Sequence, residues 1–179
     1  MRYEVRIGGF GGQGVITMGH LLGTAVTLHM GLQAVMTESY GPEARGGSCK
    51  TDVVISNAPI DYPKTTRLDC LVAMNPEAYS SYIHEVKEGG VVVFDSSLFT
   101  VESEAKGVKY FAVPATKLAQ GLGNPQVANV VMLGSLSEAT DLFSLEALSR
   151  AVTDRFPKAS VLNIKALQVG AESARKAKE

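Results

Sequence analysis

The chain of 179 residues has no tryptophan, three histidines and two cysteines. The cysteines, Cys49 and Cys70, are too few and too far apart to hold an iron–sulfur cluster or a structural zinc ion, which take about four ligands. No apolar run approaches the roughly 20 residues that cross a bilayer. The first residues also lack the apolar core of a signal peptide. The sequence therefore predicts a cytoplasmic protein with no membrane contact and no metal of its own.

The net charge of the chain is also small. The formal net charge of −1 gives no electrostatic reason to expect nucleic acid as a partner. The hydrophobic content of 45% and the charged content of 20% are ordinary for a globular protein. A chain of this length builds one domain with a full core and is short for two. We therefore expect a single domain over residues 1–179.

Short apolar segments alternate with helical patterns along the whole chain. We expect Cys70 to be buried in a strand and Cys49 to lie in a loop, where its thiol can be exposed. Alternating strands and helices predict an α/β domain of three layers, α/β/α, with a largely parallel or mixed sheet. The expected strands are 2–7, 33–38, 51–56, 69–74, 91–95 and 109–114. The expected helices are 15–30, a segment between Asn75-Pro76 and Gly89-Gly90, 125–139, and two C-terminal helices capped by Ser144 and Asn163.

A glycine-rich motif, G-x-G-x-x-G, follows the first strand and opens the first helix. Its glycines allow backbone N–H groups to approach a phosphate at the positive end of a helix, as in dinucleotide-binding folds. Tight packing of the helix on the strand is the alternative. The first strand carries Arg2, Glu4 and Arg6 on one face, whereas a first Rossmann strand is usually apolar on both. The candidate binding residues of this loop are Gly9, Gly11, Gly12, Gln13 and Gly14.

A second loop, "SYGPEARGGSCK", follows the second strand, where open α/β sheets bind ligands. It offers a hydroxyl group, an aromatic ring, a rigid Gly-Pro turn and one arginine. The guanidinium of this arginine is suited to a bidentate contact with phosphate or carboxylate. A surface ion pair between Glu43 and Arg45 is the alternative. The candidate binding residues of this loop are Ser39, Tyr40, Arg45, Gly46 and Gly47.

The rest of the chain offers little chemistry. Helix capping explains Asn75 and Asn124, but no local role explains Asn129. No nucleophile, base and acid stand at local spacing, although catalytic triads are rarely local. We therefore name no catalytic residue, and the chain looks like a binding domain whose chemistry lies elsewhere.

Four segments in this order, "GFGGQGV", "SYGPEARGG", "DVVISNAPID" and "GNPQVANVVMLG", resemble the gamma subunit of 2-oxoacid:ferredoxin oxidoreductases. The resemblance extends to about residue 170. The form of the second segment is most similar to the 2-oxoglutarate branch. The resemblance implies a fold that is Rossmann-like without being a standard dinucleotide-binding fold.

The resemblance also implies partners. Such an enzyme decarboxylates a 2-oxoacid on thiamine diphosphate, passes electrons through iron–sulfur clusters to ferredoxin, and transfers the acyl group to coenzyme A. Thiamine diphosphate and the clusters would belong to alpha, beta and ferredoxin-like delta subunits. The two glycine loops would face coenzyme A, with Arg45 toward its phosphates. The isolated chain would be inactive and could self-associate, and the apolar helix 125–139 would suit subunit packing.

Two other functions remain open from the residues alone. The first is a free-standing NAD(P)- or FAD-dependent oxidoreductase of Rossmann type, with Glu38 placed loosely where a ribose-binding acid would lie. The second is an assembly subunit without a ligand, in which the glycines only pack and the loops only touch partners.

Overall fold

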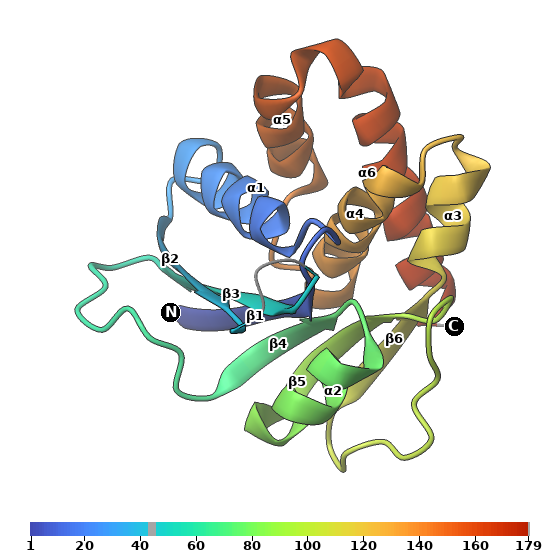
Figure 1. The fold of residues 1–179 in the computed structure, drawn as a ribbon. Coiled ribbons are helices and arrows are strands. Elements are labelled where there is room, and N and C mark those ends of the chain that lie inside the picture. The colour runs from blue at the N-terminus through green and yellow to red at the C-terminus, as the bar shows by residue number, and fades with distance from the viewer. Residues whose placement is uncertain (43–45, 179) are drawn as a thin grey trace.

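The computed structural model describes residues 1–42 and 46–178. Its centre is one six-stranded sheet with the order β2-β3-β1-β4-β5-β6 (Figure 1). The predicted strands are all present, most of them longer than expected. Their bounds are β1 Arg2–Phe10, β2 Gln33–Tyr40, β3 Ser48–Ser56, β4 Leu68–Ala73, β5 Val86–Asp95 and β6 Lys109–Val113.

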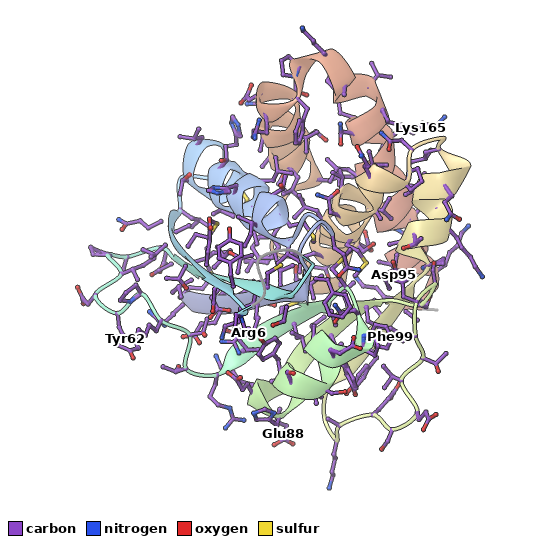
Figure 2. All side chains as sticks on the ribbon, viewed as in Figure 1. Arg6, Tyr62, Glu88, Asp95, Phe99 and Lys165 are labelled. Carbon is purple, nitrogen blue, oxygen red and sulfur yellow. The ribbon has the colours of Figure 1, made fainter. Side chains whose placement is uncertain are left out.

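The helices are distributed unevenly over the two faces of the sheet. One face carries a thick layer of helices, and the other carries α2 and the segment around Phe99 (Figures 1 and 2). The α/β fold with a mixed sheet confirms the predicted class. The helices are α1 Val15–Leu28, α2 Pro76–Tyr82, α3 Ala115–Gly121, α4 Ala128–Thr140, α5 Leu145–Arg155 and α6 Ser160–Lys176, with short 3-10 turns η1 Ile83–Glu85, η2 Pro125–Val127 and η3 Pro157–Ala159.

The strand directions separate this sheet from a standard dinucleotide-binding fold. Strand β3 lies between β1 and β2 and is antiparallel to both, while β4, β5 and β6 follow β1 in parallel. In a standard dinucleotide-binding fold, the strand that follows the first helix lies directly beside β1. Here that strand, β2, is the edge strand.

The alternation in β1 has a different consequence from the one expected. Val5 and Ile7 enter the main core below α1, and Glu4 and Arg6 point to the opposite face. Both charged side chains are nevertheless buried, with 2% and 3% exposure, and β1 is an inner strand. A polar face on this strand is therefore compatible with an inner position in the sheet, because tertiary partners satisfy its charges.

Helix α4 does not form an exposed apolar surface. Its residues are buried within this chain, mainly against α6. The two helices approach so closely that a Cβ added to Gly134 would lie 2.0 Å from the carbonyl oxygen of Leu167, and one added to Gly170 would lie similarly close to Val131. The expectation that this helix packs against another subunit is wrong, because α6 already covers it.

Three local predictions also fail. Gly89 and Gly90 do not end a helix but lie within β5, and a Cβ at Gly90 would meet Asp69 and Lys87. Asn163 does not cap α6, because the helix begins at Ser160 and the Asn163 amide donates to the carbonyl of Ala159. Helix α3, which follows Pro114, was not expected.

The caps at Asn75 and Ser144 are confirmed. Their side chains accept hydrogen bonds from the N–H groups of Ala78 and Ala147. In the described part of the chain, no helix has both the length and the apolar character needed to cross a membrane.

Candidate functional site

The two glycine-rich loops lie side by side. The N–H of Gly11 donates to the carbonyl of Gly47 at 2.8 Å, and a Cβ added to Gly11 would lie 3.3 Å from the nitrogen of Gly46. This contact continues the register of β1 and β3, in which Gly9 faces Cys49 and Phe10 faces Ser48. The antiparallel pairing of these strands therefore brings together two segments that lie more than 30 residues apart in the sequence.

The glycine loop lies where the chain changes sides of the sheet. Strands β1 and β4 are parallel neighbours, but β1 leads into α1 on the thick layer and β4 leads into α2 on the opposite face (Figure 1). The carboxyl ends of such a pair form a crevice, which is the usual ligand position in open α/β sheets. The site therefore occupies a topological switch point.

Gln13 fixes the shape of the loop. Its Oε1 accepts a hydrogen bond from the N–H of Phe10 at 2.7 Å and one from Asn75 Nδ2 at 3.3 Å. Its Nε2 donates to the carbonyl of Met74 at 3.1 Å. Asn75 also caps α2, so one side chain connects the loop, the end of β4 and the start of α2. These hydrogen bonds explain why the motif contains a polar residue at Gln13.

The glycines of the loop serve different purposes. Gly14 has a φ of 76°, and a Cβ there would lie 2.3 Å from Nδ2 of Asn129. Gly12 has a φ of 95°, but a Cβ there would meet nothing within 4 Å. Gly9 lacks room for a side chain beside Met74 and Val15. Packing therefore accounts for Gly9 and Gly14, whereas Gly12 faces open space.

The start of α1 is not capped by any side chain that the structure describes. The N-cap residue is Gly14, and the first turn contains no acidic residue. The first N–H groups of a helix have no partner inside the helix and carry partial positive charge. Together with the exposed backbone at Gly12, they form a surface suited to an anionic group.

Asn129, for which no role was expected, lies beneath this loop. Its Nδ2 is 3.4 Å from the carbonyl of Gly14, and its residue is buried at the start of α4. It thus ties the first helix to the fourth. No local pattern indicates this role, because 115 positions separate the two partners.

The second loop is shorter than expected. Ser39 and Tyr40 belong to β2, two strands away from β1, and Tyr40 donates its hydroxyl hydrogen to Glu38 at 2.9 Å. Glu38 itself lies 3.2 Å from His20, on the far side of β3 from the glycine loop. Of the predicted second-loop residues that the structure describes, Gly46 and Gly47 are the ones beside the glycine loop. Arg45 lies outside the described residues.

A buried cation lies under the sheet near the site and was not predicted. Arg6 makes a bidentate pair with Asp52, at 2.6 and 2.9 Å, and lies 2.7 Å from Glu85. Burial alone would lower the pKa of Arg6, but these two carboxylates outweigh it and raise the pKa, so the guanidinium stays charged. The ring centre of Tyr82 lies 4.7 Å from Cζ of Arg6 and 5.2 Å from Nζ of Lys50, so both cations face this ring.

Neither cysteine is suited to chemistry. Cys49 lies in β3 and is 7% exposed, so the expectation of a loop position is wrong, and Cys70 is fully buried as predicted. Burial raises the pKa of the Cys49 thiol, which disfavours the reactive thiolate.

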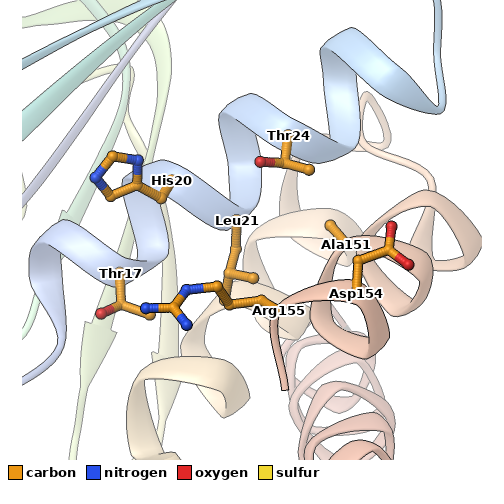
Figure 3. Close-up of a pocket in the computed structure, with 7 residues that line it drawn as sticks. All are labelled: Thr17, His20, Leu21, Thr24, Ala151, Asp154 and Arg155. Atoms are coloured by element: carbon orange, nitrogen blue, oxygen red, sulfur yellow. The ribbon is translucent and has the colours of Figure 1, made fainter. Parts of the chain in front are cut away.

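A separate hollow lies between α1 and α5 (Figure 3). It has a volume of about 240 Å³ and no residue of the glycine loop in its lining, which consists of Thr17, His20, Leu21, Thr24, Ala151, Asp154 and Arg155. Figure 3 shows Arg155 crossing toward Thr17, so charged and small polar groups share the hollow.

The fold and the glycine loops match one protein family. Residues 4–173 match the pyruvate ferredoxin/flavodoxin oxidoreductase family. The chain belongs to this family. It is also 47% identical to the 2-oxoglutarate synthase subunit KorC of Methanothermobacter thermautotrophicus, over 96% of this chain and 95% of the relative. KorC of Methanocaldococcus jannaschii is 43% identical over 98% and 95%.

Solved structures of the family agree. The gamma subunit of a keto/oxoacid ferredoxin oxidoreductase from Geobacter sulfurreducens superposes with a TM-score of 0.86 at 40% identity, over 99% of this chain and 98% of that one. The 2-oxoglutarate:ferredoxin oxidoreductase of Magnetococcus marinus gives 0.89 at 26% identity over 98% of this chain, but over 31% of its own longer chain. This oxidoreductase chain is therefore a gamma subunit of a 2-oxoacid:ferredoxin oxidoreductase, which is a multi-subunit complex, and the predicted family is confirmed.

Proposed function

We propose that this gamma subunit serves a complex that converts 2-oxoglutarate to its acyl-coenzyme A, with ferredoxin as the electron acceptor. The identities of 47% and 43% to two KorC subunits, over nearly the full length of both chains, support 2-oxoglutarate as the substrate. The whole chain, 1–179, would act as one gamma-type domain, and its cytoplasmic location stays a prediction. The complex would require its other subunits for activity.

Within the complex, the paired loops at Gly11 and Gly47 would face coenzyme A. The observation that carries this proposal is the hydrogen bond between them, which joins the start of α1 and the two glycine segments into one surface. Backbone N–H groups of this kind bind phosphate oxygens. The Magnetococcus relative was solved with 2-oxoglutarate, coenzyme A and succinyl-coenzyme A bound. Arg45 would add a cation to this surface.

The chemistry would take place on partner chains. Enzymes of this family use thiamine diphosphate, iron–sulfur clusters and coenzyme A. Among the described residues, no three metal-ligating side chains come together. We propose that the alpha, beta and ferredoxin-like delta subunits hold these cofactors. The gamma subunit would contribute positioning, which lowers a barrier when the reacting groups lie on a neighbour.

The test compares two glycines of similar backbone. Gly12 and Gly31 have φ values of 95° and 66°, and a Cβ at either would meet nothing within 4 Å. Alanine should therefore strain both positions similarly, by about 1 kcal/mol. In the reconstituted complex, Gly12→Ala should raise the KM for coenzyme A several-fold, whereas Gly31→Ala should leave it unchanged.

Two further measurements complete this test. Arg45→Ala should raise the same KM, with a smaller effect for Arg45→Lys because lysine keeps the charge. The KM for 2-oxoglutarate should change little in each variant. If Gly12→Ala and Arg45→Ala both leave the coenzyme A kinetics unchanged, the loops serve assembly alone.

A further inference from the structure

The two edge strands of the sheet differ in how well they are protected against pairing with a further strand. Strand β6 has five residues, begins with Lys109 and is followed by Pro114, and both residue types discourage pairing with another strand. Strand β2 has eight residues and contains neither lysine nor proline. Every residue of β2 is exposed or half-exposed, and within the described chain β3 is its single neighbour in the sheet. The β2 edge is therefore open to a further strand.

The register shows which groups of β2 face outward. The N–H of Gly41 donates to the carbonyl of Ser48 at 2.7 Å, and these two residues continue the pairing of β2 with β3. Bonded and non-bonded pairs alternate along an antiparallel ladder. The odd-numbered residues of β2 therefore bond to β3. The outward backbone groups belong to Ala34, Met36, Glu38 and Tyr40.

A hollow adjoins this edge on the side of α1. It has a volume of about 230 Å³ and is lined by Gly19, His20, Gly23, Thr24, Thr27, Ala34 and Met36. A Cβ added to Gly23 would meet nothing within 4 Å. The side chains of a strand paired with β2 would alternate between the two faces of the sheet, and those on this face would enter the hollow. Backbone groups and space for side chains thus occur together.

We propose that β2 pairs with β2 of a second copy of this chain, antiparallel, with Met36 facing Met36 across a two-fold axis. Outward residues must face outward residues for both backbone bonds to form, so an even-numbered residue must face an even-numbered residue. With Met36 on the axis, Ala34 faces Glu38 of the second copy. Seven residues of each strand then pair, and two sheets become one of twelve strands.

The charges of this edge fit a second copy. Glu38 is the single charged residue of β2, and its own His20 lies 3.2 Å away. The pairing places this carboxylate opposite an alanine, so no like charges face each other. Helix α1 packs over β2 and β3. A helix centred between these two strands would lie two strand spacings, about 10 Å, from α1 of the second copy, which matches the usual 8–10 Å between packed helices.

Sedimentation velocity of the full chain tests the pairing. The wild-type chain should show a monomer–dimer equilibrium between about 1 and 200 μM, a range that covers the affinity of modest interfaces. Ala34→Glu would place like charges opposite each other twice, so the dissociation constant should rise about tenfold. Ala34→Lys would instead face Glu38 of the second copy and should lower that constant several-fold. In a Glu38→Gln background the two variants should behave alike.

The outcomes separate the possibilities clearly. A wild-type chain that stays monomeric throughout this range overturns the proposal, as does an equal response to Ala34→Glu and Ala34→Lys. Met36→Cys provides a second check of the register, because it introduces a thiol at the two-fold axis and keeps the residue nearly apolar. Its Cα atoms would be about 5.5 Å apart across the axis, within disulfide range, so oxidation should give a covalent dimer. Thr37→Cys, whose partner is Val35, should not, and a dimer from both variants alike would also overturn the proposed register.

Discussion

The N–H of Gly11 and the carbonyl of Gly47 lie 2.8 Å apart, on the line of the ladder that joins β1 to β3. The bond extends this ladder beyond the last paired residues of both strands. The glycine loop and the end of the second loop are therefore one backbone unit, which a change in either loop would disturb.

Gly14 should tolerate a side chain less well than Gly12. Both have positive φ values, but a Cβ at Gly14 would lie 2.3 Å from Asn129, whereas Gly12 is open. Gly12→Ala should lower the free energy of unfolding by about 1 kcal/mol, from backbone strain alone. Gly14→Ala should lower it by about 3 kcal/mol, because overpacking is added to the strain. Urea unfolding of the two variants measures this difference, and equal losses would contradict it.

Removing one partner of the Arg6–Asp52 pair should destabilise the fold strongly, and replacing both partners should destabilise it less than the two single changes combined. The two side chains are 4% and 9% exposed. Asp52→Ala would leave a buried guanidinium with one carboxylate fewer, so the free energy of unfolding should fall by about 3–5 kcal/mol. The double variant Arg6→Met, Asp52→Ala should lose less than the sum of the single variants.

A complete double-mutant cycle in urea measures that coupling. Lys87 and Asp69, a pair with 38% and 21% exposed side chains, provide the control. Their coupling should not exceed about 1 kcal/mol. Additive effects of Arg6→Met and Asp52→Ala would show that the buried pair contributes nothing.

Glu4 should make folding sensitive to acid. Burial tends to raise the pKa of Glu4, but N–H donors from Thr66 and Arg67 and the guanidinium of Arg2 outweigh it, so the pKa is lowered. A carboxyl whose pKa is lower in the folded state contributes stability above its unfolded pKa of about 4.5, and this stability is lost as the pH falls through the folded value.

The free energy of unfolding should therefore decrease between about pH 6 and pH 3, and less steeply in Glu4→Gln than in the wild type. The gap between the two proteins should narrow in acid. Glu102→Gln, at an exposed position, should leave the slope as it is. Parallel curves for wild type and Glu4→Gln would contradict the assignment.

The contact of α4 with α6 should depend on glycine. A Cβ at Gly134 would lie 2.0 Å from the backbone oxygen of Leu167, so Gly134→Ala must push the helices apart and should cost about 3 kcal/mol. Gly121, also helical, has no atom within 4 Å of an added Cβ. Gly121→Ala should be neutral or stabilising by up to about 1 kcal/mol. Thermal unfolding compares the pair, and a mild effect at Gly134 would refute the close approach.

Much of the fold could be predicted from local patterns. The strand alternation, the apolar runs and the caps at Asn75 and Ser144 each depend on residues a few positions apart. The errors arose where tertiary contact overrides a local signal. Gly89 and Gly90 look like a helix stop but lie within β5, where Gly90 lets the strand pass close to Asp69 of β4. Asn163 looks like a cap but bonds back along α6.

The site shows the same division. The motif and its position after a strand were visible in the sequence, and the structure pairs Gly11 with Gly47 as two adjacent loops require. The network around Arg6 was not visible, because its partners Asp52 and Glu85 are distant in the chain. The sequence pattern predicts Ser39 and Tyr40 in a loop, because it does not show that β2 continues to Tyr40.

The alternation within β1 also protects the sheet against misalignment. A slip of one residue would turn Glu4 and Arg6 into the apolar space beneath α1 and move Val5 and Ile7 to the polar face. Two unpaired charges would then be buried, and two aliphatic side chains would lie among carboxylates and N–H donors. Misaligned pairings of the central strand are thus penalised on both faces at once, which should narrow the routes by which this sheet assembles.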